Sequence, residues 1–165
     1  HTPSAIAVPR TGVEAAPGAG RRAVTADGRV GLEALAAAAR AELPTMARLA
    51  QLRDRFEAEA AGIAPGLKVF GAAAPRLANT SCVALAGLPA ETQLMALDLA
   101  GVAVSSGAAC SSGKVQPSHV LTAMGATADE AGSAIRVSLG WASEAEDVER
   151  LLVAWGDLYR RSQAA

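Results

Sequence analysis

Hydrophobic residues recur at helical spacing through the first half of the chain. The Ala- and Leu-rich segment from Gly31 to Leu43 predicts a helix. Pro44 should kink this helix or restart it, because proline lacks a backbone N–H and its ring clashes with the preceding turn. Beyond the proline, apolar residues continue at intervals of three or four, at Met46, Leu49, Leu52 and Phe56. We expect Gly62 or Gly66 to end this long, kinked helix.

Short strands and helices alternate from residue 67 onward. Apolar and β-branched runs bounded by Gly, Pro or Ser predict four strands, within residues 67–71, 80–88, 102–106 and 135–140. The segments between and after them predict helices, at residues 89–101, 116–125 and 127–134. A final helix over residues 143–161 has Ser143 as its predicted N-cap, with acidic residues in its first turns and arginines in its last.

This order of elements predicts an α+β fold. We expect a two-layer arrangement in which a small sheet of about four short strands carries helices on one face. The long kinked helix leads into this sheet, and the sequence contains no internal repeat.

Composition and charge narrow the classes of function. At 165 residues and 51% hydrophobic content, the chain is long enough to bury the core of a single domain. The formal net charge is −1 and basic residues do not cluster with aromatic ones, so nucleic-acid binding is not expected.

No apolar run reaches the roughly 20 residues that span a bilayer, and residues 1–10 do not resemble a signal peptide. Membrane insertion is therefore not expected either.

The two cysteines lie in different settings. Cys82 belongs to the apolar run TSCVALAG, whereas Cys110 is flanked by small residues in SSGAACSSG. This pair predicts free cytosolic thiols rather than a disulfide framework, and the scattered His and Cys residues show no zinc spacing.

A nucleophilic thiol requires access to solvent and a lowered pKa, and the residues around Cys110 fit both requirements. Small residues provide access, while Lys114 or the start of the following helix favours a thiolate. His119 is a third candidate for this role, although on a helix it can also simply cover the surface. The alternative is a loop cysteine without a chemical task.

The motifs around Cys110 follow a recognisable order. GVAVSSGAACSSG precedes PSHVLTAMG, which precedes SAIRVSLG, and RLANTSCVAL lies upstream of all three. This order resembles the C-terminal part of the cysteine desulfurases of the NifS/IscS type, which are fold-type I pyridoxal-phosphate (PLP) enzymes of the class V aminotransferase group. The resemblance covers about residues 66–158, and the longer thiol loop is more similar to the IscS-like branch.

The resemblance implies a division of the chain into two parts. Residues 1–29 would be a strand and loop remnant of the family's large domain. Residues 30–165 would form its small C-terminal domain, with the catalytic-cysteine loop at residues 105–114.

The resemblance also implies roles for individual residues. In such enzymes PLP activates L-cysteine, the Cys110 thiolate would attack the substrate sulfur, and a persulfide on Cys110 and free L-alanine would result. Arg136, in IRVSLG, would hold the substrate carboxylate by a bidentate pair, with an ion pair to an Asp or Glu as the alternative. Asn79 and Thr80 would shape the start of their strand, and Ser105 and Ser106 would satisfy backbone groups at the base of the loop.

The PLP-binding residues are only partly represented. GRRAVTADG is similar to a family loop that would place Thr25 against the PLP phosphate of the neighbouring subunit, and an ordinary solvent loop is the alternative. Val24 and Asp27 depart from the family's glycine and asparagine there. The Schiff-base lysine is expected upstream of residue 1, because neither Lys68 nor Lys114 has the family's Ser-x-His-Lys setting.

The resemblance implies a cytoplasmic homodimer with L-cysteine as substrate and no bound metal. Its sulfur would pass to an acceptor protein, such as an iron–sulfur scaffold or a tRNA-thiolation protein. Two alternatives stay open. One is a PLP-free sulfur-relay or interaction domain that receives its persulfide on Cys110 from a partner, and the other is a truncated, inactive homologue.

Overall fold

The computed structural model describes residues 37, 40–41, 43–106 and 118–164. The long helix expected in the first half is α2, which spans Leu43–Ile63. Pro44 is the second residue of α2, and residues 40 and 41 before it are helical as well. The predicted boundary between residues 29 and 30 lies outside the described residues.

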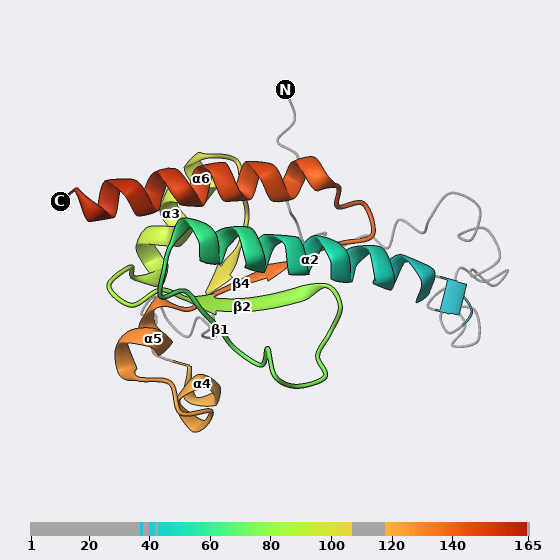
Figure 1. Ribbon diagram of the computed structural model, residues 1–165, viewed down its shortest axis with the longest axis horizontal. Helices are drawn as coiled ribbons and strands as arrows, with labels where there is room; N and C mark the ends of the chain where they lie inside the picture. Colours follow the sequence, from blue (N-terminus) through green and yellow to red (C-terminus); the bar gives the residue numbers. More distant parts are fainter. Residues whose placement is uncertain (1–36, 38–39, 42, 107–117, 165) are drawn as a thin grey trace, which may run out of the picture.

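The sheet contains the four strands that the sequence predicts, each shorter than its predicted segment (Figure 1). They are β1 (Lys68–Val69), β2 (Thr80–Ala84), β3 (Ser105–Ser106) and β4 (Ile135–Ser138). Their order is β1-β2-β4-β3, and every neighbouring pair is antiparallel. Together with the helices, this sheet confirms the predicted α+β fold.

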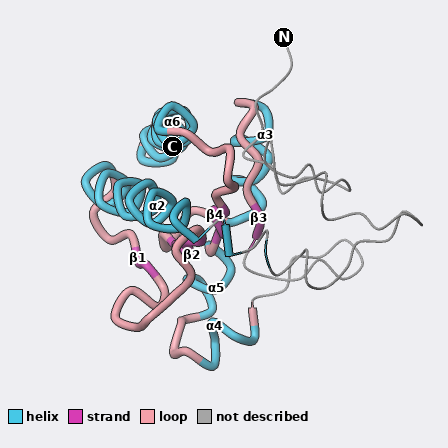
Figure 2. The backbone as a smooth tube through the Cα atoms, turned by 90° about the vertical axis from the view of Figure 1, so that its right-hand side faces the viewer, coloured by secondary structure: helices cyan, strands magenta, loops and turns pink. Residues whose placement is uncertain are grey.

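Three long helices cover one face of the sheet, which we call the first face. These are α2, α3 (Ala90–Leu99) and α6 (Ala145–Gln163), and Figure 2 shows them on the same side of the strands. Alternate strand residues point into this layer because successive side chains of a strand leave on opposite faces. The main core joins them to Phe56 of α2 and Trp155 of α6, and its strand residues include Val83, Ile135 and Val137.

Two short helices, α4 (His119–Ala123) and α5 (Ala128–Ser133), pack on the opposite, second face (Figure 2). A smaller core lies there, built from Phe70, Ala84, Leu121, Ala126, Ala131 and Ala134. The expectation of helices on one face thus holds for the long helices, whereas the short ones form a further partial layer. The reason is that β2 and the segment before β4 also carry apolar side chains toward this second face.

Local signals place most helix ends correctly. Helix α3 lies between Pro89 and Gly101, and Gly101 adopts φ +76°, a conformation that favours glycine. The predicted N-cap of α6, Ser143, is wrong by one residue, because Glu144 caps the helix through a capping box with Asp147. Ser143 instead accepts a hydrogen bond from the Gly140 N–H at 2.9 Å, within the preceding turn.

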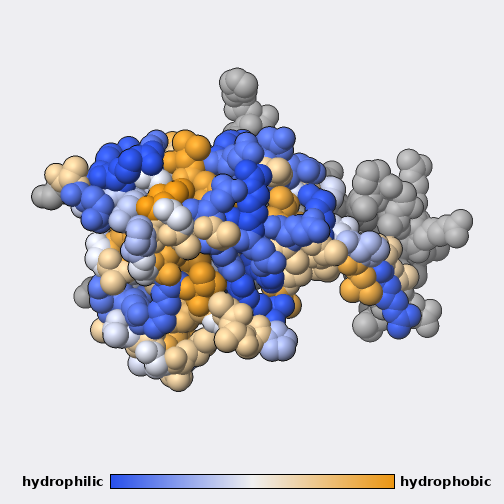
Figure 3. Space-filling view, in the orientation of Figure 1, coloured by the Kyte–Doolittle hydropathy of each residue, from blue (hydrophilic) through white to orange (hydrophobic). Residues whose placement is uncertain are grey.

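The surface is mixed in polarity. In Figure 3, hydrophilic residues colour much of α2 and α6, and hydrophobic residues show in the seam between these helices. Across the described part of the chain, no helix combines the length and hydropathy that crossing a membrane requires.

Candidate functional site

The second face of the sheet is apolar at one end and polar at the other. Helices α4 and α5 cover the apolar end, where Ala84 and Ala134 lie. At the polar end, Cys82 of β2 and Ser105 of β3 are both register partners of Arg136 on β4. Directly opposed residues of antiparallel strands project from the same face with Cβ atoms about 5 Å apart. We call Cys82, Arg136 and Ser105 the polar row.

Arg136 is the central residue of the polar row. Its neighbours along β4, Ile135 and Val137, are buried in the main core, whereas Arg136 itself is exposed. No hydrogen bond or ion pair joins its guanidinium to any described residue. The alternative that a carboxylate of the domain neutralises Arg136 therefore finds no support in the described part of the chain. An unpaired guanidinium of this kind can bind a ligand carboxylate through two parallel hydrogen bonds.

Most other arginines of the described residues are engaged. Arg76 donates two hydrogen bonds to Glu57, at 2.5 and 2.6 Å. Arg48 donates to the backbone carbonyls of Ser143 and Trp141, at 2.5 and 2.6 Å. Arg136 differs from these arginines because it lies in a strand and none of the described residues pairs with its charge.

Cys82 lies beside Arg136 as a half-buried free thiol. Burial raises the pKa of this thiol, although the positive charge of Arg136 acts in the opposite direction. Cys82 is therefore neutral at physiological pH and supplies no counter-charge to Arg136. Its raised pKa also distinguishes it from a nucleophilic cysteine, which needs a lowered one.

The predicted thiol loop is attached at this side of the sheet. Cys110 and Lys114 lie within residues 107–117, outside the described residues, as does Thr25. The loop follows β3 directly, and the described chain resumes at Ser118, whose hydroxyl caps α4 by accepting from the Leu121 N–H at 3.4 Å. The loop therefore begins two residues after Ser105 of the polar row and leads to α4, which covers the apolar end of the same face.

The described residues do not supply an anchor for PLP. Lys68 is the one lysine among them, and its ammonium donates to Glu130 at 2.8 Å and lies 5.2 Å above the Phe70 ring. The hydrogen bond from Lys68 lowers the pKa of the Glu130 carboxylate, which keeps this pair charged. Lys68 therefore joins β1 to α5 and is not placed to form a Schiff base. The other predicted candidate, His119, is exposed at the first residue of α4 and does not lie in the polar row.

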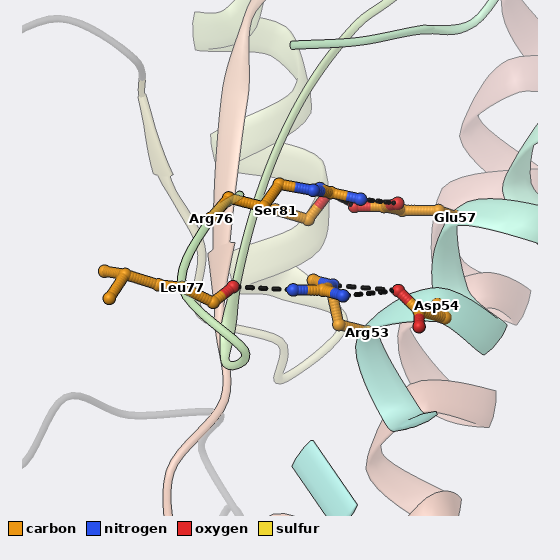
Figure 4. A network of polar contacts seen from close by, with 6 residues as sticks. All are labelled: Arg53, Asp54, Glu57, Arg76, Leu77 and Ser81. Carbon is orange, nitrogen blue, oxygen red and sulfur yellow. Dashed lines mark hydrogen bonds and ion pairs between the residues drawn. The ribbon is translucent and has the colours of Figure 1, made fainter. Parts of the chain in front are cut away.

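A polar network on the first face holds β2, and with it Cys82, against α2 (Figure 4). Glu57 of α2 accepts the bidentate pair from Arg76 and a hydrogen bond of 2.6 Å from the buried Ser81 hydroxyl. Burial by itself raises the pKa of Glu57, but the hydrogen bonds from Arg76 and Ser81 and the nearby charges outweigh it. The pKa of Glu57 consequently lies below its ordinary value of 4.5.

The start of β2 is fixed by Asn79, as the sequence predicts. Its side-chain amide donates to the Leu139 carbonyl at 3.0 Å, and its backbone carbonyl accepts from the Leu139 N–H at 2.8 Å.

The sequence analysis did not predict the polar row. Cys82, interpreted as a core residue of an apolar run, is half-buried and packs against the smaller core. The expected hydrogen bonds from Ser105 to backbone groups do not occur within the described residues, whereas the buried Ser106 does not lack a partner. The alternation in IRVSLG was the one local signal that turns Arg136 away from the core.

Comparison with known proteins supplies a family. Residues 28–151 match the family "Aminotransferase class-V". A protein of Klebsiella pneumoniae named cysteine desulfurase is 35% identical over 147 residues, which is 88% of this chain and 37% of that protein. One of Cereibacter sphaeroides with the same name is 46% identical over 101 residues, 61% of this chain and 26% of that protein.

A solved structure shares the fold. The X-ray structure of a NifS-like protein from Rickettsia africae ESF-5 superposes with a TM-score of 0.65 at 29% sequence identity, covering 77% of this chain and 33% of that one. The chain thus spans roughly a quarter to two fifths of the length of these relatives.

Proposed function

Because the chain belongs to the aminotransferase class-V family, we propose that it is the thiol-bearing C-terminal portion of a cysteine desulfurase. Sulfur passes from L-cysteine to the Cys110 thiol, which becomes a persulfide, and L-alanine is released. Relatives named cysteine desulfurase that align with up to 88% of the chain support this assignment. Arg136 binds the substrate carboxylate in this proposal.

The observation that carries the proposal is the Arg136 guanidinium, which has no partner among the described residues and whose register partner Ser105 precedes Cys110 by five residues. A substrate carboxylate bound there lies close to the loop attachment, because Ser105, the register partner of Arg136, is followed at once by the last residue of β3. Cys110 is the fourth residue after Ser106. Four peptide units reach at most about 14 Å, so Cys110 cannot be remote from the end of β3.

PLP is the cofactor that this proposal implies, and the described residues do not hold it. Such a cofactor acts as an electron sink for the bound amino acid. Its lysine anchor lies outside the described residues, and Thr25 is proposed to contact its phosphate from a neighbouring subunit. To the described residues we assign the binding of the substrate carboxylate alone.

The two cysteines provide a matched test of the proposed function. The full protein is incubated with L-cysteine, and sulfur on each thiol is located by alkylation and mass spectrometry. We expect persulfide on Cys110, its loss together with alanine production in Cys110→Ser, and no such loss in Cys82→Ser. Persistent sulfur transfer in Cys110→Ser contradicts the proposal. Labelling of Cys110 by a persulfide donor, without labelling by L-cysteine, identifies a relay domain instead.

The role of Arg136 is tested by a change that keeps the charge. Arg136→Lys loses the planar fork that binds both carboxylate oxygens, so we expect the KM for L-cysteine to rise about tenfold. Arg161→Lys is the matched control, because Arg161 is exposed near the end of α6. Equal kinetic constants for both variants would remove Arg136 from substrate binding.

The remaining parts of the proposal concern the whole protein. We propose that it acts as a cytoplasmic homodimer and that an iron–sulfur scaffold or another acceptor protein takes the sulfur from Cys110. Size-exclusion chromatography with light scattering measures the first point, and transfer of labelled sulfur to a purified scaffold measures the second.

A further inference from the structure

Ser105 is a second polar side chain of the polar row, next to Arg136. It is half-buried on β3, and its hydroxyl has no hydrogen-bond partner among the described residues. The adjacent Ser106 is buried and faces the main core, because consecutive strand residues alternate. Ser105 and not Ser106 therefore shares the face of Arg136.

The register places the Ser105 hydroxyl and the Arg136 guanidinium where both can reach one small anion. The two residues are direct partners across β3 and β4, so their Cβ atoms are about 5 Å apart. The guanidinium has five N–H donors and the serine hydroxyl contributes one further O–H donor. A carboxylate, with two oxygens and about four lone pairs, accepts a bidentate arginine and still has capacity for a hydroxyl.

We propose that Ser105 donates a hydrogen bond to the carboxylate that Arg136 binds, so that β3 and β4 form one two-residue site for an amino-acid carboxylate. This inference rests on the proposed function and deepens it by adding a second substrate-binding residue. Its consequence is that β3 has two tasks, since it binds the substrate and also leads directly into the loop that bears Cys110.

Cys82, on the other side of Arg136, is consistent with an anion site. The thiol is neutral, because burial raises its pKa. The polar row consequently contains one positive charge, two neutral side chains and no carboxylate. A bound anion meets no like charge within the row, and its own charge offsets that of Arg136.

The first experiment measures binding rather than activity. The full chain, labelled with ¹⁵N, is titrated with L-alanine, the proposed product, and with L-alaninamide, which has the same side chain but no carboxylate. We expect L-alanine to shift the Arg136 Nε–H signal and L-alaninamide to leave it unchanged. In Ser105→Ala the Kd for L-alanine should rise about tenfold or more, as expected for the loss of one hydrogen bond to a charged group.

Ser105→Thr is the rescue variant, because threonine keeps the hydroxyl and is well suited to a strand. Recovery of the wild-type Kd in Ser105→Thr supports the inference. An unchanged Kd in Ser105→Ala, with binding lost in Arg136→Ala, overturns it by showing that Arg136 acts alone. Equal binding of L-alanine and L-alaninamide also overturns it, because the site then does not recognise a carboxylate.

Kinetics separate this inference from the proposed function. In the active protein we expect Ser105→Ala to raise the KM for L-cysteine about tenfold with kcat within about twofold, since the lost contact binds the substrate uniformly. Absence of desulfurase activity in the wild type contradicts the proposed function, while the titration still tests the carboxylate site. A fall in kcat with unchanged KM and Kd contradicts the role of Ser105 in binding.

Discussion

Gln93 provides the strongest test of how the helices are joined. Its side chain is 1% exposed and makes three hydrogen bonds. The amide nitrogen donates to the Leu88 and Ser133 carbonyls at 2.7 and 2.8 Å, and the amide oxygen accepts from the Trp155 indole N–H at 2.9 Å. One buried amide thus connects the start of α3, the end of α5 and the middle of α6.

The substitution Gln93→Leu keeps the approximate volume and removes all three bonds. A buried donor or acceptor that loses its partner costs about 1–3 kcal/mol. The apolar replacement recovers part of the cost of three such groups, so we expect the free energy of unfolding to fall by about 3 kcal/mol. For a domain of this size such a loss lowers the Tm by about 10 °C.

Urea denaturation followed by circular dichroism measures this loss, and Gln51→Leu is the matched control. Gln51 is exposed on α2, and the same chemical change there should alter stability by less than about 0.5 kcal/mol. In a Trp155→Phe background, which has already lost the indole N–H, Gln93→Leu should cost about 1 kcal/mol less. Equal effects of Gln93→Leu and Gln51→Leu would refute the reasoning that the buried amide is structurally required.

Two further predictions concern a titrating group and a backbone conformation. The pKa of Glu57 is lowered in the fold, so its stabilising contribution is complete above about pH 5 and is lost as pH falls through the folded pKa. Glu57→Gln should therefore flatten the stability profile between about pH 5 and pH 3, and an unchanged slope in acid denaturation contradicts this. Gly101→Ala should destabilise by about 1 kcal/mol because φ is +76° there, although a Cβ would meet no atom within 4 Å. The same change at Gly132, within α5 and without positive φ, should be neutral or stabilising in thermal melts, and similar losses at both sites would rule out a conformational cause.

Elements whose signals lie within a few residues were predictable. Pro89 and Gly101 bound α3 because each acts through its own backbone preference. The apolar and β-branched run around Arg136 predicted the strand β4, and the alternation of Ile135, Arg136 and Val137 is the local pattern that accounts for its one outward charge. Near misses also have local causes. Both Ser143 and Glu144 can cap a helix, and the choice depended on the turn in which Ser143 binds the Gly140 N–H.

The sequence by itself therefore determined the kinds of element, their approximate limits and the family resemblance around Cys110. Helix and strand propensity, helix capping and the alternation of side chains act over a few residues. A short segment of the sequence is therefore enough to predict them. Only the tertiary structure decided that Ser105 and Cys82 flank Arg136, that no carboxylate of the described residues pairs with Arg136 and that Gln93 is buried beside Trp155. Strand register and the pairing of polar groups depend on residues distant in the sequence. Such contacts are selected by the packing of the whole domain, which no single segment specifies.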